Sequence, residues 1–132
     1  MGHYLRRDSR IETIKNIIDP FQKQLNNIEE ICKKNGFDCW DNFYADDTEH
    51  LLGTVFIVLQ NYINSSISDL YPELIKLHCK YTLDKKVNKN SQTTRIELII
   101  ALANYYKHRD LPTKLHKFTT NPLVDLKIEY NL

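Results

Sequence analysis

The chain has 132 residues, 42% of them hydrophobic, and that length is enough for one domain with a core of its own. Glycine (3) and proline (4) are scarce, which excludes turn-rich β-sandwiches and barrels and favours long helices. The formal net charge of +1 does not indicate a partner, but residues 38–73 hold seven acids and no lysine or arginine, whereas residues 76–117 hold ten bases and three acids.

The N-terminal quarter predicts helix. Isoleucine recurs on one face from residue 11 to residue 18, which indicates a first helix. Asp8 or Ser9 can cap that helix, because their side-chain oxygens accept hydrogen bonds from backbone N–H groups. Asp19-Pro20 then gives a second start signal, and the apolar pattern continues to Gly36, a residue type that commonly ends helices. These residues predict either two successive helices or one helix kinked at Pro20.

The middle of the chain predicts a loop from Phe37 to Ala45 and then the longest helix. Asp46-Asp-Thr-Glu49 has the pattern of a capping box, and apolar residues follow on nearly all sides as far as Leu70, which indicates a central helix. Residues 51–68 carry no charge, but their amides and serines make this stretch too polar for a membrane-spanning helix. We therefore expect no membrane association.

The C-terminal part predicts shorter elements. The apolar pattern runs on to Leu83, and residues 85–90 form a solvated turn. Ser91 is the expected cap of a helix from Thr93 to about Arg109. A short helix or turn should follow Pro112, and Asn121-Pro122 should break the chain before a last element of uncertain type. Together the elements predict an all-α antiparallel bundle with a long central helical hairpin, in a single domain spanning residues 1–132.

Three cysteines, Cys32, Cys39 and Cys79, make an odd number, and no apolar secretory run follows Arg6-Arg7. We expect free, mostly buried thiols in a reducing, cytoplasmic compartment. No Cys-x2-Cys or His-Glu-x2-His pattern is present, so neither a metal site nor a cofactor is expected.

Asn104 and His108 form the first candidate site, because a spacing of four places both on one face of a helix. The imidazole can act as a general acid or base on a phosphodiester, and Arg109 can neutralise a phosphate. The alternative is a surface histidine beside a structural asparagine. On the central helix, Glu49, Gly53, Gln60 and Asn64 also share a face, so the sequence predicts either an interhelical hydrogen-bond network or a polar pocket. The members of that pocket would be Gln60, Asn64, Asn104 and His108.

The run Asn104-Tyr-Tyr-Lys-His108, near the end of a late helix in such a bundle, resembles the HEPN superfamily of small helical nucleases and nucleotide-binding modules. The motif of that family is an arginine, a polar residue, a few free positions and a histidine, and the arginine acts with the histidine in RNA cleavage. Asn104 and His108 match, whereas the arginine position is Ala103. Arg109-x6-His116 also has a loose arginine-to-histidine spacing, but it straddles Pro112. The resemblance covers residues 46–110 and implies a HEPN-like fold, and the missing arginine implies a member that binds without cleaving.

A second candidate site lies between residues 38 and 49, where acids and aromatic rings alternate. Aromatic anchors surrounded by carboxylates suit a tight interface with a basic protein. The alternative is that the rings are core and the acids only cap a helix. The expected partner-binding residues are Asp38, Trp40, Asp41, Phe43, Tyr44, Asp46, Asp47 and Glu49.

These observations lead to three hypotheses. The first is a non-enzymatic immunity or antitoxin protein that neutralises a bacterial toxin, a basic nuclease domain, through the acidic-aromatic surface. In size and helical class the chain is also similar to immunity proteins of contact-dependent growth inhibition systems. The second is a HEPN-type, metal-independent ribonuclease or nucleotide-binding toxin that uses His108 and Arg109, with Asn104, and has RNA as its partner. The third is a structural helical module that dimerises, so both a monomer and a homodimer are considered.

Overall fold

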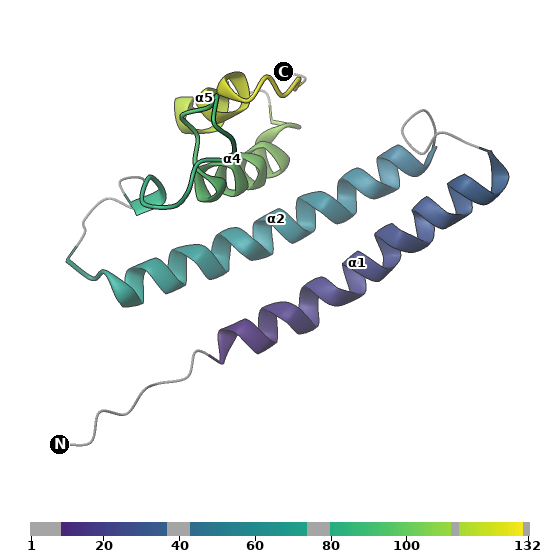
Figure 1. Ribbon diagram of the computed structural model, residues 1–132, viewed down its shortest axis with the longest axis horizontal. Helices are drawn as coiled ribbons and strands as arrows, with labels where there is room; N and C mark the ends of the chain where they lie inside the picture. Colours follow the sequence, from purple (N-terminus) through teal and green to yellow (C-terminus); the bar gives the residue numbers. More distant parts are fainter. Residues whose placement is uncertain (1–8, 37–42, 74–79, 112–113, 131–132) are drawn as a thin grey trace. The chain divides into compact units, whose positions relative to one another are not determined.

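The computed structural model describes residues 9–36, 43–73, 80–111 and 114–130, with the backbone alone at 43–45 and 47. These residues form four helices and no strand: α1 (Arg10–Asn35), α2 (Phe43–Leu70), α4 (Arg95–His108) and α5 (Lys117–Asp125) (Figure 1). The predicted all-α class is therefore confirmed. The chain divides into two compact units, residues 1–49 and 50–132, with the boundary inside α2.

The first unit contains α1, which runs through Pro20 as one continuous helix. The alternative with two successive helices is therefore wrong. The less exposed side chains follow one face in alternating steps of four and three, the spacing of a packed helical seam, and Pro20 lies outside it. Ile11 (44% exposed) and Ile17 (38%) also lie outside, contrary to the predicted stripe. The seam consists of Ile14, Ile18, Phe21, Leu25, Ile28 and Cys32.

The two ends of α1 differ in how well they are capped. Ser9 occupies the N-cap position, but its side chain makes no capping hydrogen bond. At the C-terminus Gly36 adopts a left-handed conformation (φ 68°), and its N–H bonds to the carbonyls of Cys32 and Lys33. The predicted end at Gly36 is confirmed, because this left-handed position costs glycine little.

Cys32 is buried and disulfide-bonded. The prediction of free thiols is therefore wrong for this cysteine. The two other cysteines of the chain, Cys39 and Cys79, lie outside the described residues. Because disulfides persist mainly in oxidising compartments, this bond argues against the expected reducing compartment.

The helix α2 begins at Phe43, three residues before the predicted cap. Phe43 to Ala45 are therefore helical, whereas the sequence predicted a loop, and Asp46-Asp-Thr-Glu49 lies within the helix rather than at its start. The helix ends at Leu70, the last apolar residue of the predicted central helix, shortly before Pro72. Lys80 is buried and donates a hydrogen bond to the Tyr71 carbonyl at 2.7 Å, so its positive charge stabilises the C-terminal end of α2. Among the described residues no helix is long and apolar enough to cross a membrane.

In the second unit α4 begins after Thr94, not after Ser91. Thr94 forms a complete capping box with Glu97: the Thr94 hydroxyl accepts the Glu97 N–H at 3.1 Å, and the Glu97 carboxylate accepts the Thr94 N–H at 2.8 Å. Ser91 is buried instead, and its hydroxyl lies 3.5 Å from the Asn88 carbonyl. The predicted Ser91 cap is wrong because Thr94-x-x-Glu97 satisfies two backbone donors, which Ser91 cannot do.

Pro122 lies inside α5, so the predicted break at Asn121-Pro122 is wrong. The helix ends three residues later, where Lys127 adopts a left-handed conformation (φ 56°). Its N–H bonds to the Val124 carbonyl at 3.0 Å, and the Ile128 N–H bonds to the Leu123 carbonyl at 2.9 Å. This pair of bonds is a Schellman motif, which closes the C-terminus of the helix without a glycine.

Candidate functional site

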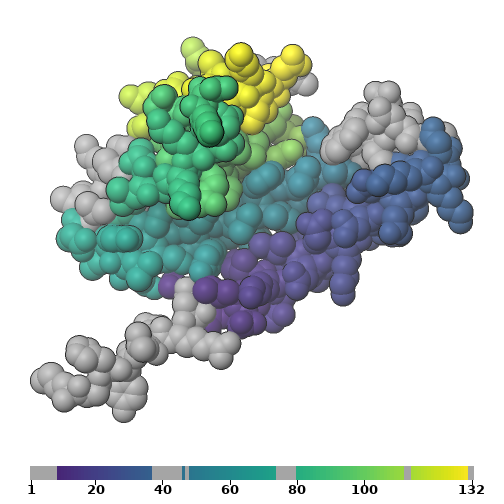
Figure 2. Space-filling view, in the orientation of Figure 1, coloured from purple at the N-terminus to yellow at the C-terminus, as the bar shows by residue number. Residues whose placement is uncertain are grey.

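The helix α5 packs against α4 (Figures 1 and 2). Phe118 and Thr119 of α5 line a pocket together with the predicted pair, Asn104 and His108. Glu97, Ile100, Asn104 and His108 follow one another at steps of three, four and four, so they share one face of α4. Two pockets lie along this row of four residues, and Phe118 of α5 lines both of them. We call them the histidine pocket, near the end of α4, and the carboxylate pocket, near its start.

The histidine pocket has a volume of about 340 Å³. Its three basic side chains, His108, Lys114 and His116, are exposed, whereas Leu115 and Thr119 are buried beneath them. No acidic side chain is among its described lining residues. The full described lining is Asn104, His108, Lys114, Leu115, His116, Phe118 and Thr119.

His116 is the N-cap residue of α5. Its Nδ1 accepts a hydrogen bond from the Phe118 N–H at 3.3 Å, so in the neutral ring the proton resides on Nε2. The ring also packs against Phe118, with centroids 5.0 Å apart. These two contacts orient the imidazole and leave Nε2–H as a donor.

Asn104 is held from the opposite side by α2. Its side-chain oxygen accepts a hydrogen bond from Nε2 of Gln60 at 2.9 Å, and Gln60 is only 6% exposed. The sequence predicted either an interhelical hydrogen-bond network or a polar pocket around Gln60, and its partner across the helices is Asn104. This bond fixes the orientation of the Asn104 amide, whose N–H groups can donate to a ligand.

The four residues of the predicted polar pocket do not converge on one site. Asn64 accepts a hydrogen bond from the Tyr81 hydroxyl at 2.6 Å, away from the Gln60–Asn104 pair. Burial raises the pKa of Tyr81 above its ordinary value, so the phenol is a neutral donor. Of the four predicted residues, only Asn104 and His108 line the histidine pocket.

Arg109 is engaged in packing. Its Cζ lies 5.3 Å from the centroid of the Tyr106 ring, and its Nε lies 3.8 Å from a carboxylate oxygen of Asp110. Tyr106 in turn packs against α2 at Gly53, where an added Cβ would lie 2.9 Å from the tyrosine Cγ. The absence of a side chain at Gly53 therefore lets Tyr106 approach α2 closely. Arg109 is not among the described lining residues of the histidine pocket.

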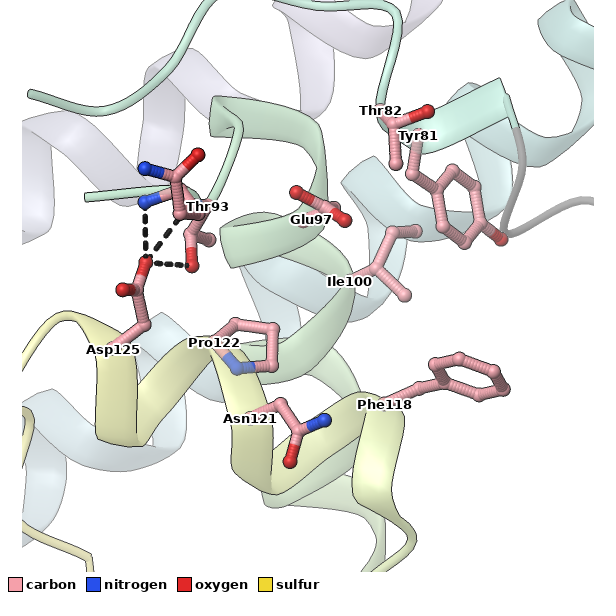
Figure 3. Close-up of a pocket in the computed structure, with 10 residues that line it drawn as sticks. Tyr81, Thr82, Thr93, Glu97, Ile100, Phe118, Asn121, Pro122 and Asp125 are labelled. Carbon is pink, nitrogen blue, oxygen red and sulfur yellow. Dashed lines mark hydrogen bonds between the residues drawn. The ribbon is translucent and has the colours of Figure 1, made fainter.

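The carboxylate pocket has a volume of about 410 Å³ and lies between the start of α4, the end of α5 and Tyr81 (Figure 3). Asp125 uses one oxygen, Oδ2, to accept three hydrogen bonds: from the Gln92 N–H, the Thr93 N–H and the Thr93 hydroxyl, at 2.9, 2.9 and 2.6 Å. The side-chain bond from Thr93 is the main reason that the pKa of Asp125 is below its ordinary value. Asp125 is therefore ionised at neutral pH.

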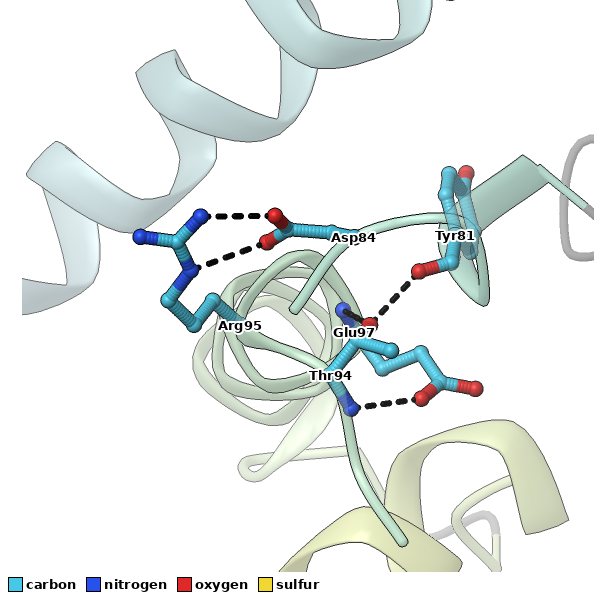
Figure 4. A network of polar contacts seen from close by, with 5 residues as sticks. All are labelled: Tyr81, Asp84, Thr94, Arg95 and Glu97. Atoms are coloured by element: carbon cyan, nitrogen blue, oxygen red, sulfur yellow. Dashed lines mark hydrogen bonds and ion pairs between the residues drawn. The ribbon is translucent and has the colours of Figure 1, made fainter. Parts of the chain in front are cut away.

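A polar network around the start of α4 holds the other wall of this pocket (Figure 4). The Thr94 hydroxyl donates to the Tyr81 carbonyl at 2.5 Å while it accepts from Glu97. Arg95 donates two hydrogen bonds to Asp84, at 2.7 and 3.2 Å, and these bonds lower the pKa of Asp84. The network attaches residues 81–84 to α4 and so positions the Tyr81 ring.

The acidic-aromatic surface lies largely outside the described residues. Asp38, Trp40 and Asp41 are not described, and of Phe43, Tyr44 and Asp47 only the helical backbone is. Asp46 and Glu49 are described, and both are exposed. The surface stays a prediction.

The sequence analysis did not assign Lys114 or Phe118 to a site, and it considered His116 only through its spacing from Arg109. The available signal was the basic run Lys114-Leu-His-Lys117, which follows His108-Arg109 after a proline. The part of the chain that the structure describes contains no group of three or more His, Cys, Asp or Glu side chains able to hold a metal ion.

Comparisons of the chain with protein-family models, with curated proteins and with solved structures found no match. The two pockets and the exposed charges are therefore the features of the protein that bear on its function.

Proposed function

We propose that this protein binds a phosphate-bearing ligand, a single-stranded RNA or a nucleotide, in the histidine pocket. The observation that carries the proposal is the convergence of His108, Lys114 and His116 on one cavity of about 340 Å³. Lysine and imidazole N–H groups are strong donors to phosphate oxygens, and no described acid in the pocket competes for them.

The donors come from three separate parts of the chain. His108 lies at the end of α4, Lys114 in the connection that follows, and His116 at the cap of α5. The Asn104 amide adds a neutral donor whose orientation is set by Gln60. Donors held by different elements can surround a tetrahedral anion, whereas donors on a single helical turn meet only one side of it.

The side chains support binding without cleavage. Two imidazoles in one pocket suit proton transfer at a phosphodiester, one as base and one as acid. However, the arginine that the HEPN resemblance associates with cleavage is replaced by the buried Ala103, and Arg109 packs on Tyr106. We therefore propose a binding module, and an RNA-degradation assay of the purified protein tests this part of the proposal.

The binding experiment uses a short single-stranded RNA and its dissociation constant at two salt concentrations. Lys114→Gln is expected to weaken binding about tenfold, because one charge-assisted hydrogen bond is lost. His116→Asn removes the imidazole but keeps a side chain that caps helices well. Lys89→Gln is the matched control, because it makes the same charge change at an exposed turn.

Equal losses in Lys114→Gln and Lys89→Gln would show that the RNA meets only a diffuse positive surface, and the proposed site would then be wrong. A loss confined to the pocket variants supports it. Cleavage of RNA that His108→Ala abolishes would replace the binding module by a ribonuclease.

Exposed acids favour a second candidate function, an immunity or antitoxin protein that neutralises a bacterial nuclease. Asp46 and Glu49 project from the first two turns of α2, where no basic residue is present in the sequence from 38 to 73. Neutralising both residues should weaken a complex with a basic nuclease domain and reduce its salt dependence. Asp19→Asn on α1 is the control, and an unchanged complex in the double variant would exclude these two residues from the interface.

Both proposed functions require access to cellular RNA or to a nuclease that acts on it, so the cytoplasm is the proposed location. The disulfide at Cys32 is the observation against it, because cytosolic thiols are kept reduced. The sequence left both a monomer and a homodimer open, and the molar mass measured by light scattering distinguishes them.

A further inference from the structure

We propose that the carboxylate pocket is the base-binding half of the same site and that it selects guanine. The inference rests on the proposed function, because it assigns the second end of a ligand whose phosphate lies in the histidine pocket. Phe118 connects the two halves, since it lines both pockets and is 44% exposed.

The two ends of the site are opposite in charge. Asp125 bonds to residues just before α4, whereas His116 joins His108 at the other end of α4, so α5 runs antiparallel to α4. Glu97 and His108 are eleven residues apart on one face, which corresponds to about 16 Å along the helix axis. An occupant of both pockets must therefore carry an anion at one end and hydrogen-bond donors at the other.

The acidic end offers acceptors. Within the described residues, Oδ2 of Asp125 accepts three hydrogen bonds and one oxygen of Glu97 accepts the Thr94 N–H. Each carboxylate keeps a second oxygen to which no described residue donates. An ionised carboxylate accepts hydrogen bonds only, so this end attracts N–H groups and repels a phosphate.

The walls between these carboxylates and Phe118 are apolar and partly aromatic. Ile100 and Pro122 are buried, and the rings of Tyr81 and Phe118 lie on the side away from Asp125 (Figure 3). Aromatic side chains of this kind stack nucleobases regardless of their sequence. The pocket therefore accepts a flat ring system and restricts its hydrogen bonds to one edge.

Guanine fits these constraints better than the other bases. Its N1–H and 2-amino group point from the same edge and can bond to both oxygens of a carboxylate or to two neighbouring carboxylates. Adenine and cytosine present one amino group beside ring acceptors, and uracil presents one N–H between two carbonyls. Carboxylates reject those acceptors because two lone pairs then face each other.

The test compares the dissociation constants of the 5′-monophosphates of guanosine, inosine, adenosine and uridine, with inorganic phosphate as the reference probe. We expect guanosine monophosphate to bind at least about tenfold more tightly than uridine monophosphate. Inosine monophosphate, which lacks the 2-amino group, should fall between them. Glu97→Gln keeps an oxygen for the Thr94 cap. It should reduce the affinity for guanosine monophosphate to the affinity for uridine monophosphate.

The controls separate this inference from the function on which it rests. Glu129→Gln removes an exposed acid outside both pockets and should leave the guanine preference intact. Phe118→Leu should weaken every nucleotide by a larger factor than inorganic phosphate, because the stacking ring is lost for the base. It provides a second variant if Glu97→Gln does not fold. Equal binding of all four nucleotides, or a preference for another base, overturns the base site while the phosphate site stands. No binding of any nucleotide or of phosphate overturns both.

Discussion

Asp125 and Thr93, thirty-two residues apart in the sequence, are joined by two hydrogen bonds to one carboxylate oxygen, and the Gln92 N–H donates a third. These bonds attach the end of α5 to the segment that enters α4. They thereby determine that α5 lies along the Asn104–His108 face, on which the histidine pocket depends. Losing these bonds should therefore weaken ligand binding at the histidine pocket as well as destabilise the fold.

Replacing Asp125 is expected to loosen the C-terminal helix. Asp125→Asn keeps the shape but removes the charge, and its oxygen is a weaker acceptor for three donors. We expect a Tm lower by several degrees in circular dichroism and a loss of RNA binding at the histidine pocket. Glu129→Gln, which also removes one nearby acid, should change neither quantity. An unchanged Tm in Asp125→Asn would contradict the role given to these bonds.

Acidification should destabilise the protein through Asp125 and Asp84. Hydrogen bonds from Thr93 and from Arg95 hold the pKa values of these two carboxyls below their ordinary values. Because the pKa is lower in the folded state, the stabilisation is fully present above the ordinary value of about 3.9 and is lost as pH falls through the folded-state value. A series of Tm values between pH 6 and pH 2 should show this fall, and Asp125→Asn should make it shallower.

The position of the α4 cap can be tested with alanine variants of Thr94 and Ser91. Thr94→Ala should lower the free energy of unfolding by about 1 kcal/mol, because the capping box loses its hydroxyl acceptor. Ser91→Ala should cost less, because the Ser91 hydroxyl makes only a 3.5 Å contact with Asn88. Thr94→Ser keeps the hydroxyl and serves as the control in urea denaturation. A larger loss in Ser91→Ala would restore Ser91 as the cap.

Local patterns predicted much of the fold because helix periodicity and helix-ending residues act within a few positions. The all-α class and the end of α1 at Gly36 are such cases. The start of α4 was missed because Ser91 and Thr94 are both good caps locally. The choice between them also depends on the Tyr81 carbonyl, thirteen residues earlier, which accepts the Thr94 hydroxyl.

The candidate site was predicted only in part for the same reason. Asn104 and His108 share a face by helical geometry alone, and so they could be identified from the sequence. Lys114 and His116 reach that face only because α5 folds back on α4 and is held there by Asp125 and Thr93. Contacts between residues so far apart leave no periodic signal in a single sequence.

Gly53 and Tyr106 provide a test of the α2–α4 packing. A methyl group at Gly53 would lie 2.9 Å from the tyrosine Cγ, so Gly53→Ala should overpack the contact. Overpacking typically costs about 1–3 kcal/mol, which exceeds the gain of about 0.5–1 kcal/mol from replacing a helical glycine by alanine. In a Tyr106→Ala background the clash is absent, and Gly53→Ala should then be neutral or stabilising. The same destabilisation in both backgrounds would show that the two residues do not interact.

The disulfide at Cys32 predicts the number of reactive thiols. The chain has three cysteines, and one disulfide uses two of them, so the denatured but unreduced protein should show one free thiol. Three thiols should appear after reduction, and Cys32→Ser should show two before it. Reduction should also lower the free energy of unfolding by about 2–4 kcal/mol, because the unfolded chain gains conformational freedom. Three free thiols in protein taken from native cells without reduction would remove the disulfide, and with it the observation at Cys32 that argues against a cytoplasmic location.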